Sequence, residues 1–571
     1  MEEQNASRHG RGFIALAVFF LIATAMIALQ IYGWPYTIDD AYILIRYADH
    51  LGRGLGLVWN IGESPPVEGF TCFLWTLLLT PIVRLPGEAI VLAKGATMLA
   101  SVLLLWLVWQ SSKWLHKDSL SKSSLWHLAP VAVVGLFPGM VLHGASALET
   151  VPYTVFIVAG LLMFSREQDR GGKPWIPWSA LLLACAAMTR PEGVMAAVPC
   201  AIALLWRVKN GAARRRQVLS WFGLYAMLLT LFFTFRRLYF LAWLPNTYYT
   251  KVGGLGVEDR FIHGLRYILS CLATMAGSHA HRNMMTATHI TLAAVVGIIL
   301  AGACFLAVRR GLEGRILCGV FVLFTGAIIY EGGDWMPMCR MFVPVLPLAV
   351  LVIAAGFCEL NTRGYLRKYR AEIRLSVVVL PLLGAGYLYT IYYERNHGRG
   401  WMVNAEGNDR VYRSLAEYIR DNAGQGDSLA MMDIGYMGYV NRDLDIIDIS
   451  GLVDRTIARA PGGFLTKRYD PAYILEQHPR FMILVPDVVV HQSGEIIAAP
   501  QRDEKGDILI PPGWAREGVR IVPGLHVDRS IASHPDFARA YRFVLAYNHR
   551  ANWQPRSDYW LCLFKKVLEE D

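Results

Sequence analysis

A series of long apolar runs, the first from Phe13 to Ile31, recurs along the chain as far as Tyr392. About 20 consecutive apolar residues are enough to cross a bilayer as an α-helix. The chain of 571 residues is 54% hydrophobic and 18% charged, and its mean hydropathy is +0.34. A soluble protein of this length is less apolar, so we predict a polytopic α-helical membrane protein.

The runs predict about eleven membrane-spanning helices. The run Phe70–Val83 is not counted, because it is too short to span comfortably and fits an interfacial or re-entrant segment better. The predicted spans are Phe13–Ile31, Glu88–Trp109, Leu128–Leu142, Val151–Phe164, Trp175–Met188, Gly193–Trp206, Val218–Trp243, Thr288–Val308, Ile316–Tyr330, Phe342–Phe357 and Leu375–Tyr392.

Lysine and arginine residues gather in short segments between the apolar runs, for example at Arg214–Arg216 and at Arg309 and Arg310. Such segments mark cytoplasmic loops, so the N-terminus is expected inside and the region after Tyr392 outside. This distribution accounts for the net charge of +10, and nucleic acid is not expected as a partner. The nine cysteines are scattered singly and predict neither a disulfide framework nor a zinc site.

Two domains are predicted. Residues 1–393 form the membrane domain, with a first outer loop at residues 33–87, and residues 394–571 have the composition of a soluble α/β domain. The elements expected in this second domain are a helix at Asp409–Arg420, a strand at Ser428–Met432, a glycine-rich turn at Gly435–Gly438, a strand at Leu444–Ile449 and a helix followed by a strand at Gln477–Val490.

Five polar segments interrupt the membrane domain. Each is separated from the basic cytoplasmic segments by a membrane span, so all five are predicted to lie on the outer face. Ionisable groups near hydrocarbon cost about 2.5–3.5 kcal/mol each, so they are usually paired or functional. One shared polar cavity is predicted, and the alternative is turn chemistry where helices end. The segments are Asp39–Asp40, His143–Thr150, Thr189–Gly193, Leu244–Lys251 and Glu331–Arg340.

The adjacent carboxylates Asp39 and Asp40 are the leading catalytic candidates, and Glu68 is a further carboxylate on the same loop. The outer face has no nucleotide sugars, so sugar transfer there must use a lipid-linked donor. A polyprenyl phosphate leaving group needs cations and hydrogen bonds, whereas the acceptor hydroxyl needs a base. One aspartate suits the base role, with a slight preference for Asp40, and the other orients it, holds the acceptor or ligates a divalent cation.

The outer-face cations near the spans are candidates for holding the donor phosphate. They are Arg46, Arg190, Lys251 and Arg340. The aromatic residues of the same segments either stack on sugar rings or form the ordinary interfacial belt. They are Tyr42, Trp59, Tyr248, Tyr249 and Trp335.

Several ordered motifs together resemble the mycobacterial terminal β-(1→2)-arabinofuranosyltransferase group and the related pilin arabinosyltransferases. The motifs are Asp39-Asp40-Ala41-Tyr42 with Arg46-Tyr47, Gly56–Asn60, Glu68–Trp75, Leu148–Thr150, Arg190–Gly193, Pro245–Tyr249 with Lys251, Gly332–Pro337 and Asp448–Asp454. The chain departs from the family at Phe70-Thr71-Cys72, where Tyr-Thr-Asn usually precedes Phe-Leu-Trp. This departure bears on the sugar or the acceptor more than on the type of reaction.

The resemblance implies a GT-C glycosyltransferase fold, a decaprenyl-phosphate arabinofuranose donor and a carboxylate base at Asp39 or Asp40. Glu149, Asn246 and Asp334 lie within its motifs and complete the expected donor-binding residues. The expected acceptor is a cell-envelope glycan or glycoprotein at the outer face of the cytoplasmic membrane.

Two other function classes stay open. A secondary transporter should show internal repeats and broken helices near the bilayer midplane, and neither is evident in the sequence. A non-catalytic polyprenyl-lipid binding protein would keep the cations and lose the base.

Overall fold

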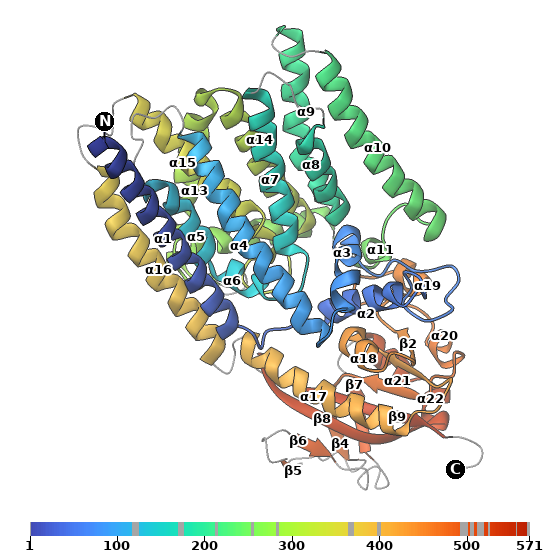
Figure 1. The fold of residues 1–571 in the computed structure, drawn as a ribbon. Helices are drawn as coiled ribbons and strands as arrows, with labels where there is room; N and C mark the ends of the chain where they lie inside the picture. The colour runs from blue at the N-terminus through green and yellow to red at the C-terminus, as the bar shows by residue number, and fades with distance from the viewer. Residues whose placement is uncertain are drawn as a thin grey trace.

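The computed structural model describes residues 2–116, 125–169, 176–211, 215–252, 256–280, 285–363, 371–396, 401–491, 501–502, 508–510, 519–523, 526–554 and 557–567. These residues form a bundle of long helices with a smaller mixed α/β domain at one end (Figure 1). This is the predicted architecture of a polytopic helical membrane protein with a C-terminal α/β domain.

Every predicted span contains helix in the structure. The bundle helices are α1 (Glu2–Tyr32), α4 (Ala89–Leu115), α5 (Ala129–Leu136), α6 (Pro138–Gly144), α7 (Thr150–Asp169), α8 (Trp178–Thr189), α9 (Val194–Lys209), α10 (Arg215–Tyr239), α13 (Ala287–Ala307), α14 (Leu312–Glu331), α15 (Val345–Thr362) and α16 (Ala371–Asn396). By length and composition, seven helical segments of the described chain could cross a membrane, or eight if a bent pair counts as one span.

The bent pair is the predicted span Leu128–Leu142, which breaks into α5 and α6 at an angle of 62°. Phe137 has an extended backbone, and Pro138 begins α6. Proline has no N–H to donate to the preceding turn, so it starts a helix readily and does not continue one. The predicted span is therefore broken near Phe137 and is not one continuous helix.

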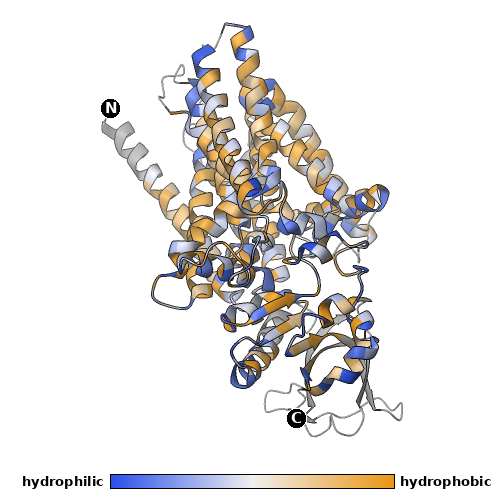
Figure 2. Ribbon diagram, turned by 90° about the vertical axis from the view of Figure 1, so that its right-hand side faces the viewer, coloured by the Kyte–Doolittle hydropathy of each residue, from blue (hydrophilic) through white to orange (hydrophobic). Residues whose placement is uncertain are grey.

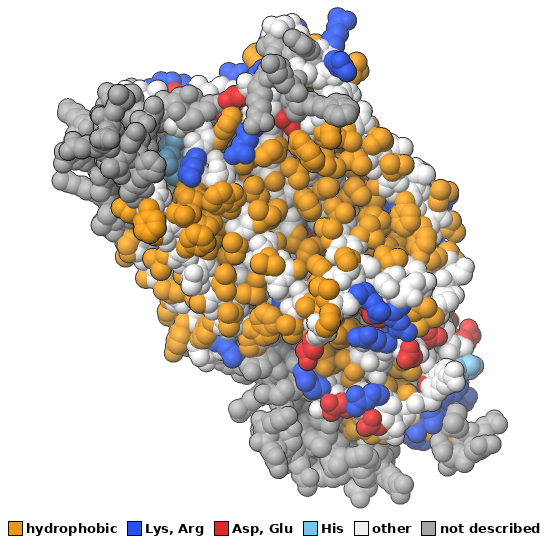
Figure 3. All heavy atoms as spheres, viewed as in Figure 1, with side chains coloured by type: hydrophobic (Ala, Val, Ile, Leu, Met, Phe, Trp, Pro, Cys, Tyr) orange, Lys and Arg blue, Asp and Glu red, His pale blue; other side chains and the backbone are white. Residues whose placement is uncertain are grey.

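The outer surface of the bundle is apolar over a broad band, which Figure 3 shows as a nearly continuous area of orange side chains. Leu99 is 74% exposed and Ile298 is 73% exposed, although both lie in the middle of long helices. Exposed apolar surface of this extent indicates contact with lipid. In Figure 2 the hydrophilic residues lie mainly at the two ends of the bundle and in the α/β domain.

Further helices, most of them short, connect the helices of the bundle. They are α2 (Asp39–Gly52), α3 (Phe73–Val83), η2 (Pro191–Gly193), α11 (Asn246–Val252), α12 (Val257–Met275) and η4 (Arg340–Phe342). The predicted first outer loop contains two of them, α2 and α3, and α2 is buried from Ala41 to His50. The 11 residues of α3 extend over only about 16 Å, so this helix is too short to span a bilayer, as predicted.

The α/β domain is built on a seven-stranded sheet with the order β2-β1-β3-β9-β8-β6-β5. Strand β1 runs parallel to β2 and β3, and β3 runs antiparallel to β9. The elements of the sheet and its helices are α17 (Trp401–Asn422), β1 (Ser428–Met431), α18 (Ile434–Val440), β2 (Asp445–Asp448), α19 (Arg455–Arg459), α20 (Ala472–Leu475), β3 (Phe481–Leu484), β5 (Gln501–Arg502), β6 (Ile508–Ile510), α21 (His526–Ala532), α22 (Pro535–Ala540), β8 (Tyr541–Gln554) and β9 (Ser557–Lys566). A separate antiparallel pair consists of β4 (Pro486–His491) and β7 (Val519–Pro523).

Two predictions for this domain are wrong. The expected glycine-rich turn at Gly435–Gly438 is part of the helix α18. Both glycines lie where this helix closely approaches the rest of the protein. The helix expected to begin at Gln477 is α20, which ends before that residue.

The two domains share one apolar core. Buried residues of α2, such as Tyr47, belong to the same cluster as Leu415 of α17 and Phe481 of β3. Figure 1 places this junction at the end of the bundle opposite the N-terminus and the α9–α10 connection. The α/β domain is therefore packed directly onto the polar end of the bundle.

Candidate active site

A buried lysine holds the segment that leads into the acidic pair. Lys94, near the start of α4, donates to the carbonyl oxygens of Trp34 and Tyr36 at 2.6 and 3.1 Å and to the Thr37 hydroxyl at 2.7 Å. Its side chain is buried, so these acceptors replace water around the ammonium group. Lys94 thereby fixes the turn from α1 into α2.

Asp39 and Asp40 occupy the first turn of α2. The carboxylate of Asp39 accepts hydrogen bonds from the backbone N–H groups of Gly435 and Tyr436, both at 2.7 Å. These two donors belong to the first turn of α18, in the α/β domain. Burial and the nearby Asp433 raise the pKa of Asp39 to about 8, although the two N–H groups lower it. Asp39 is therefore bound to the second domain.

Asp40 is half-buried. Its charge acts on Arg340, which belongs to a second polar cluster. This cluster, called the Arg340 group, consists of Glu149, Arg190, Glu192, Asp334 and Arg340. Burial lowers the pKa of Arg340, but the carboxylates of Glu149, Asp334 and Asp40 outweigh this effect and raise it. The hydroxyl of Tyr36 is also close to these charges and is buried without a hydrogen-bond partner among the described residues. Asp40 therefore belongs electrostatically to the Arg340 group.

The Arg340 group joins three of the five predicted polar segments. One oxygen of Glu149, Oε1, accepts from Arg190 Nη1 at 2.7 Å and from Arg340 Nη2 at 2.9 Å. Arg190 also pairs with Glu192 at 2.7 Å, and Arg340 pairs with Asp334 at 3.5 Å. The predicted pairing of Arg190 with Glu192 is confirmed, and it is one part of a larger network.

Burial raises the pKa of Glu149, but Arg340 and Arg190 more than compensate and lower it to about 2. Removing either partner of such a buried pair leaves an uncompensated charge, which is strongly unfavourable. Glu149 is thus held ionised across the physiological pH range.

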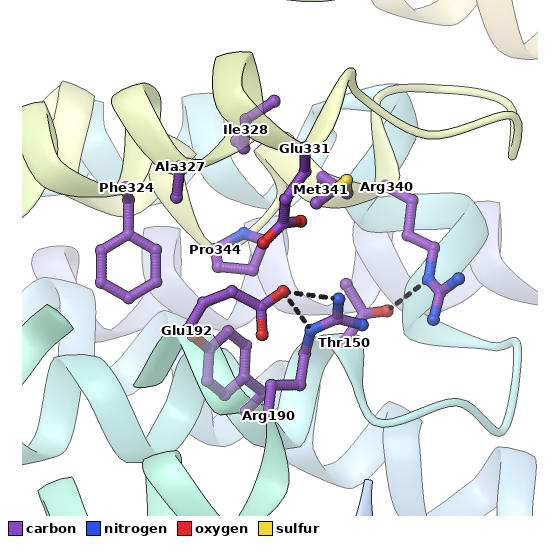
Figure 4. A pocket seen from close by; sticks show the side chains of 11 residues that line it. Thr150, Arg190, Glu192, Phe324, Ala327, Ile328, Glu331, Arg340, Met341 and Pro344 are labelled. Atoms are coloured by element: carbon purple, nitrogen blue, oxygen red, sulfur yellow. Dashed lines mark hydrogen bonds and ion pairs between the residues drawn. The ribbon is translucent and has the colours of Figure 1, made fainter. Parts of the chain in front are cut away.

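A pocket with an enclosed volume of about 30 Å³ opens beside this network. Figure 4 shows Arg190 and Glu192 on one side of the pocket, Arg340 and Thr150 at one end and Phe324 at the other end. Glu331 extends toward Glu192 across the space. The remaining lining is largely apolar and comes from α7 with Tyr153, α14 with Ala327 and Ile328, η4 with Met341, and Pro344 just before α15. The pocket therefore has a charged part and an apolar part.

Two predicted site residues lie elsewhere and hold backbone groups. The guanidinium of Arg46 donates to the carbonyl oxygens of Trp59, Gly438 and Leu444 and stacks at 4.6 Å on the Trp59 ring. The Asn246 amide donates to the carbonyl oxygens of Gly451, Leu452 and Asp454. The predictions that Arg46 and Asn246 bind the donor are therefore not supported.

Glu68, predicted as a further carboxylate in the cavity, is buried in an ion pair with Arg236 of α10. Its two oxygens lie 2.9 Å from Arg236 Nη2 and 2.8 Å from Arg236 Nε. Burial raises the pKa of Glu68 to about 7, although the charge of Arg236 lowers it. Glu68 does not line the pocket beside Arg340, and its catalytic role stays a prediction.

The other predicted residues border the junction without lining the pocket. Tyr248 and Trp335 are exposed, the ring of Tyr249 lies 4.5 Å under Arg459, and Lys251 is exposed near Phe464. The structure thus brings together Glu149, Arg190, Asp334 and Arg340, with Asp40 nearby.

Sequence reasoning missed Lys94, Arg236 and Tyr36. Lys94 is a charged residue inside the predicted span Glu88–Trp109, and such residues signal a buried partner. Arg236 lies in the same way within Val218–Trp243. No sequence pattern distinguishes Tyr36 from an interfacial aromatic residue.

A divalent cation was a further possibility at the aspartate pair. In the described part of the chain, no three His, Cys, Asp or Glu side chains are arranged to hold a metal ion. Both oxygens of Asp39 already accept N–H groups, so this pair does not present two free carboxylates. The residues present do not fit a metal site formed by both aspartates.

The fold is similar to that of solved archaeal oligosaccharyltransferase structures. The Archaeoglobus fulgidus oligosaccharyltransferase in its apo form is 12% identical to the chain, with 93% of this chain and 79% of that chain covered and a TM-score of 0.54. The same archaeal enzyme, AglB, in complex with an inhibitory peptide and a dolichol-phosphate gives the same identity and coverage, with a TM-score of 0.53. ArnT from Cupriavidus metallidurans bound to undecaprenyl phosphate is 12% identical over 83% of this chain and 93% of that chain, with a TM-score of 0.49.

At the level of sequence, a family model matches one part of the chain. Residues 402–564 match the model of a domain of unknown function, DUF8728, which corresponds to most of the α/β domain. No curated protein sequence matches the chain significantly.

Proposed function

We propose that the protein is a membrane glycosyltransferase that transfers a sugar from a polyprenyl-phosphate donor to an acceptor hydroxyl. The observation that carries this proposal is the pocket at the polar end of the bundle, where Arg190 and Arg340 meet carboxylates beside an apolar wall. Guanidinium groups bind phosphate oxygens bidentately. The carboxylates of Glu192 and Glu331 suit the hydroxyl donors of a sugar. A sugar phosphate presents both kinds of group.

The apolar wall supports a lipid-linked donor. Phe324 of α14 lines the pocket on the side away from Arg340 in Figure 4, and Ile328 of α14 and Tyr153 of α7 also line it. A second hollow, with an enclosed volume of about 50 Å³, lies farther along α7 and α14, at Val158 and Ile316, and is also lined by α4 and α15. We infer that a long isoprenoid chain whose phosphate lies at Arg340 would run along this side of α7 and α14.

Asp40 is the proposed base. In the reaction, the acceptor oxygen forms a bond to the anomeric carbon, and the bond from that carbon to the phosphate oxygen breaks. The proton of the acceptor passes to Asp40, and the polyprenyl phosphate leaves as an anion held by Arg190 and Arg340. This leaving group is weakly basic and needs no general acid.

The sugar and the acceptor are proposed from the motif resemblance. The donor sugar is arabinofuranose, and the acceptor is a cell-envelope glycan or glycoprotein at the outer face of the cytoplasmic membrane. The α/β domain lies beside Asp40 at the same end of the bundle and is placed to meet such an acceptor (Figure 1).

The test is donor consumption by the purified full-length protein in proteoliposomes. Polyprenyl-phosphate arabinofuranose labelled in the sugar is offered with an arabinan acceptor, and a mannose donor is run in parallel. Arabinose transfer is expected, and Asp40→Asn should lower kcat about a hundredfold or more. The exposed Asp443, 89% accessible on the α/β domain, supplies the matched control Asp443→Asn, which should retain the wild-type rate.

The results also separate the alternatives. Transfer of mannose but not arabinose would leave the reaction class intact and correct the sugar. Movement of a solute across the vesicles without donor consumption would favour a transporter. Saturable donor binding with no transfer to any acceptor would favour a polyprenyl-lipid binding protein.

A further inference from the structure

One face of α2 is occupied by α18 of the α/β domain. Asp39, Tyr42 and Arg46 follow each other at helical spacing and all contact this helix or the residues just after it. The ring of Tyr42 meets that of Tyr436 edge-on at 5.0 Å. The contact between the two helices therefore runs along the whole length of α18.

The close approach depends on two glycines of α18. A Cβ atom on Gly435 would collide with the backbone of Asp39, and one on Gly438 would lie 2.8 Å from the Trp59 ring. Glycine at these positions lets the α18 backbone come within hydrogen-bond distance of the Asp39 carboxylate. The contact is built from both domains.

We propose that Asp39 is a positioning residue, which uses the backbone N–H groups of Gly435 and Tyr436 to hold Asp40 in its working direction. This inference rests on the proposed function, in which Asp40 takes the acceptor proton. It makes the α/β domain a part of the active site, although that domain contributes none of the residues that line the pocket.

The physical reason lies at the beginning of α2. The residue before it, Ile38, provides no side-chain cap, and the first turn of a helix has unpaired N–H groups. Asp39 ties this turn to α18 with two hydrogen bonds of 2.7 Å. Adjacent residues of a helix project about 100° apart, so fixing Asp39 against α18 also fixes the direction of Asp40.

Steady-state kinetics test the inference from both domains. Asp39→Ala should lower kcat about a hundredfold, because a displaced catalytic group loses most of its advantage, and leave the donor KM within about twofold. Gly435→Ala should do the same by pushing α18 away. Combining the two should cause little further loss, since both act on one contact. Asp39→Asn keeps one acceptor oxygen and should retain an intermediate rate.

Amide hydrogen exchange and thiol reactivity supply readouts that do not need turnover. Asp39→Ala should increase exchange at Gly435 and Tyr436. In the Asp40→Cys protein, adding Asp39→Ala should change the rate of reaction with a small thiosulfonate several-fold. Gly424→Ala, at an exposed glycine of the same domain where a Cβ atom would make only an ordinary contact, 3.7 Å from Asp427 Oδ2, is the control and should change neither readout.

Two results would overturn the inference. The contact would be mere scaffolding if Asp39→Ala and Gly435→Ala kept the wild-type kcat and the thiol reactivity did not change. Asp39 would itself be catalytic if Asp39→Asn were as inactive as Asp40→Asn while exchange at Gly435 and Tyr436 stayed normal. If the wild-type protein consumed no donor, the proposed function would fail, while the thiol and exchange readouts would still decide the positioning contact.

Discussion

Single side chains decide which polar groups of this protein are available for chemistry. Arg190 and Arg340 both donate to one oxygen of Glu149 beside an open pocket. The N–H groups of Arg46 and Asn246 instead donate to backbone carbonyl oxygens. All four are polar residues close to membrane spans. What separates them is whether the partner is another side chain facing a pocket or the backbone of the second domain.

The first prediction concerns Arg340. Arg340→Lys should raise the donor KM about tenfold, because a single ammonium cannot contact Glu149, Asp334 and a phosphate together as a guanidinium can. The measurement is the initial rate of sugar transfer against donor concentration. Arg363→Lys is the matched control, since Arg363 pairs with Glu359 at 2.8 Å at the end of α15, away from the pocket. A wild-type KM for Arg340→Lys would contradict the assignment.

The second prediction concerns pH and Asp528 of α21. Burial raises the pKa of Asp528 to about 7, from a value of about 3.9 in an unfolded chain. The folded protein therefore binds this proton more tightly, and stability falls as pH rises from about 4 to about 7. Asp528→Asn should remove about 2 kcal/mol of this fall between pH 5 and pH 8. Thermal unfolding in detergent at both pH values checks this, and equal pH slopes for the two proteins would refute it.

At the scale of elements, the contact between α2 and the α/β domain joins the two domains of the protein. Arg46 bridges from α2 to the carbonyl oxygens of Gly438 and Leu444, and Asn60 exchanges hydrogen bonds with Ile446 of β2. From the other side, Arg455 donates to the carbonyl oxygens of Pro66 and Phe240. The predicted outer loop is thus a rigid part of the junction.

The third prediction tests this junction. Arg46→Lys should lower the free energy of unfolding by about 2–4 kcal/mol, because several buried carbonyl oxygens lose their donors. Arg442→Lys is the control, because Arg442 is exposed and is one of three arginines within 4 Å of Asp49, so its pair at 3.6 Å should contribute less than about 1 kcal/mol. Denaturant unfolding followed by tryptophan fluorescence measures both. Equal stabilities of the two variants would show that the carbonyl contacts of Arg46 are dispensable.

At the scale of the whole molecule, the structure separates two ends. The α/β domain and the pocket lie at one end of the bundle, and the N-terminus lies at the other (Figure 1). Arg310, from a basic segment, reaches the Leu115 carbonyl at the end of α4, far along that helix from Lys94 and the pocket. The basic residues and the candidate site therefore belong to opposite faces, as the positive-inside rule requires of an outer-face enzyme.

The fourth prediction is this orientation. A membrane-impermeant maleimide should label Asp443→Cys in intact cells, whereas Arg309→Cys should react only after the membrane is permeabilised. None of the nine native cysteines is exposed, so background labelling should be low. The reverse pattern would place the α/β domain inside and exclude transfer to an outer-face acceptor.

The sequence by itself determined where the bundle helices lie along the chain. It also predicted that the polar segments between them gather at one end of the bundle. Hydrophobicity over some twenty residues is a local property, so each predicted span could be found without its neighbours. The sequence also predicted one cavity shared by the five polar segments, because charged residues near hydrocarbon need partners and all five segments were placed on one face. Three of these segments meet in the structure, through Glu149, Arg190 and Arg340.

Only the tertiary structure decided which polar residues were free. Asp39 is bound by backbone N–H groups almost 400 positions away, and Asn246 by carbonyl oxygens about 200 positions away. Every residue carries such backbone groups, so no local pattern indicates which of them a distant side chain will meet. The same packing converted the expected turn at Gly435–Gly438 into a helix and made the second domain a support for Asp40.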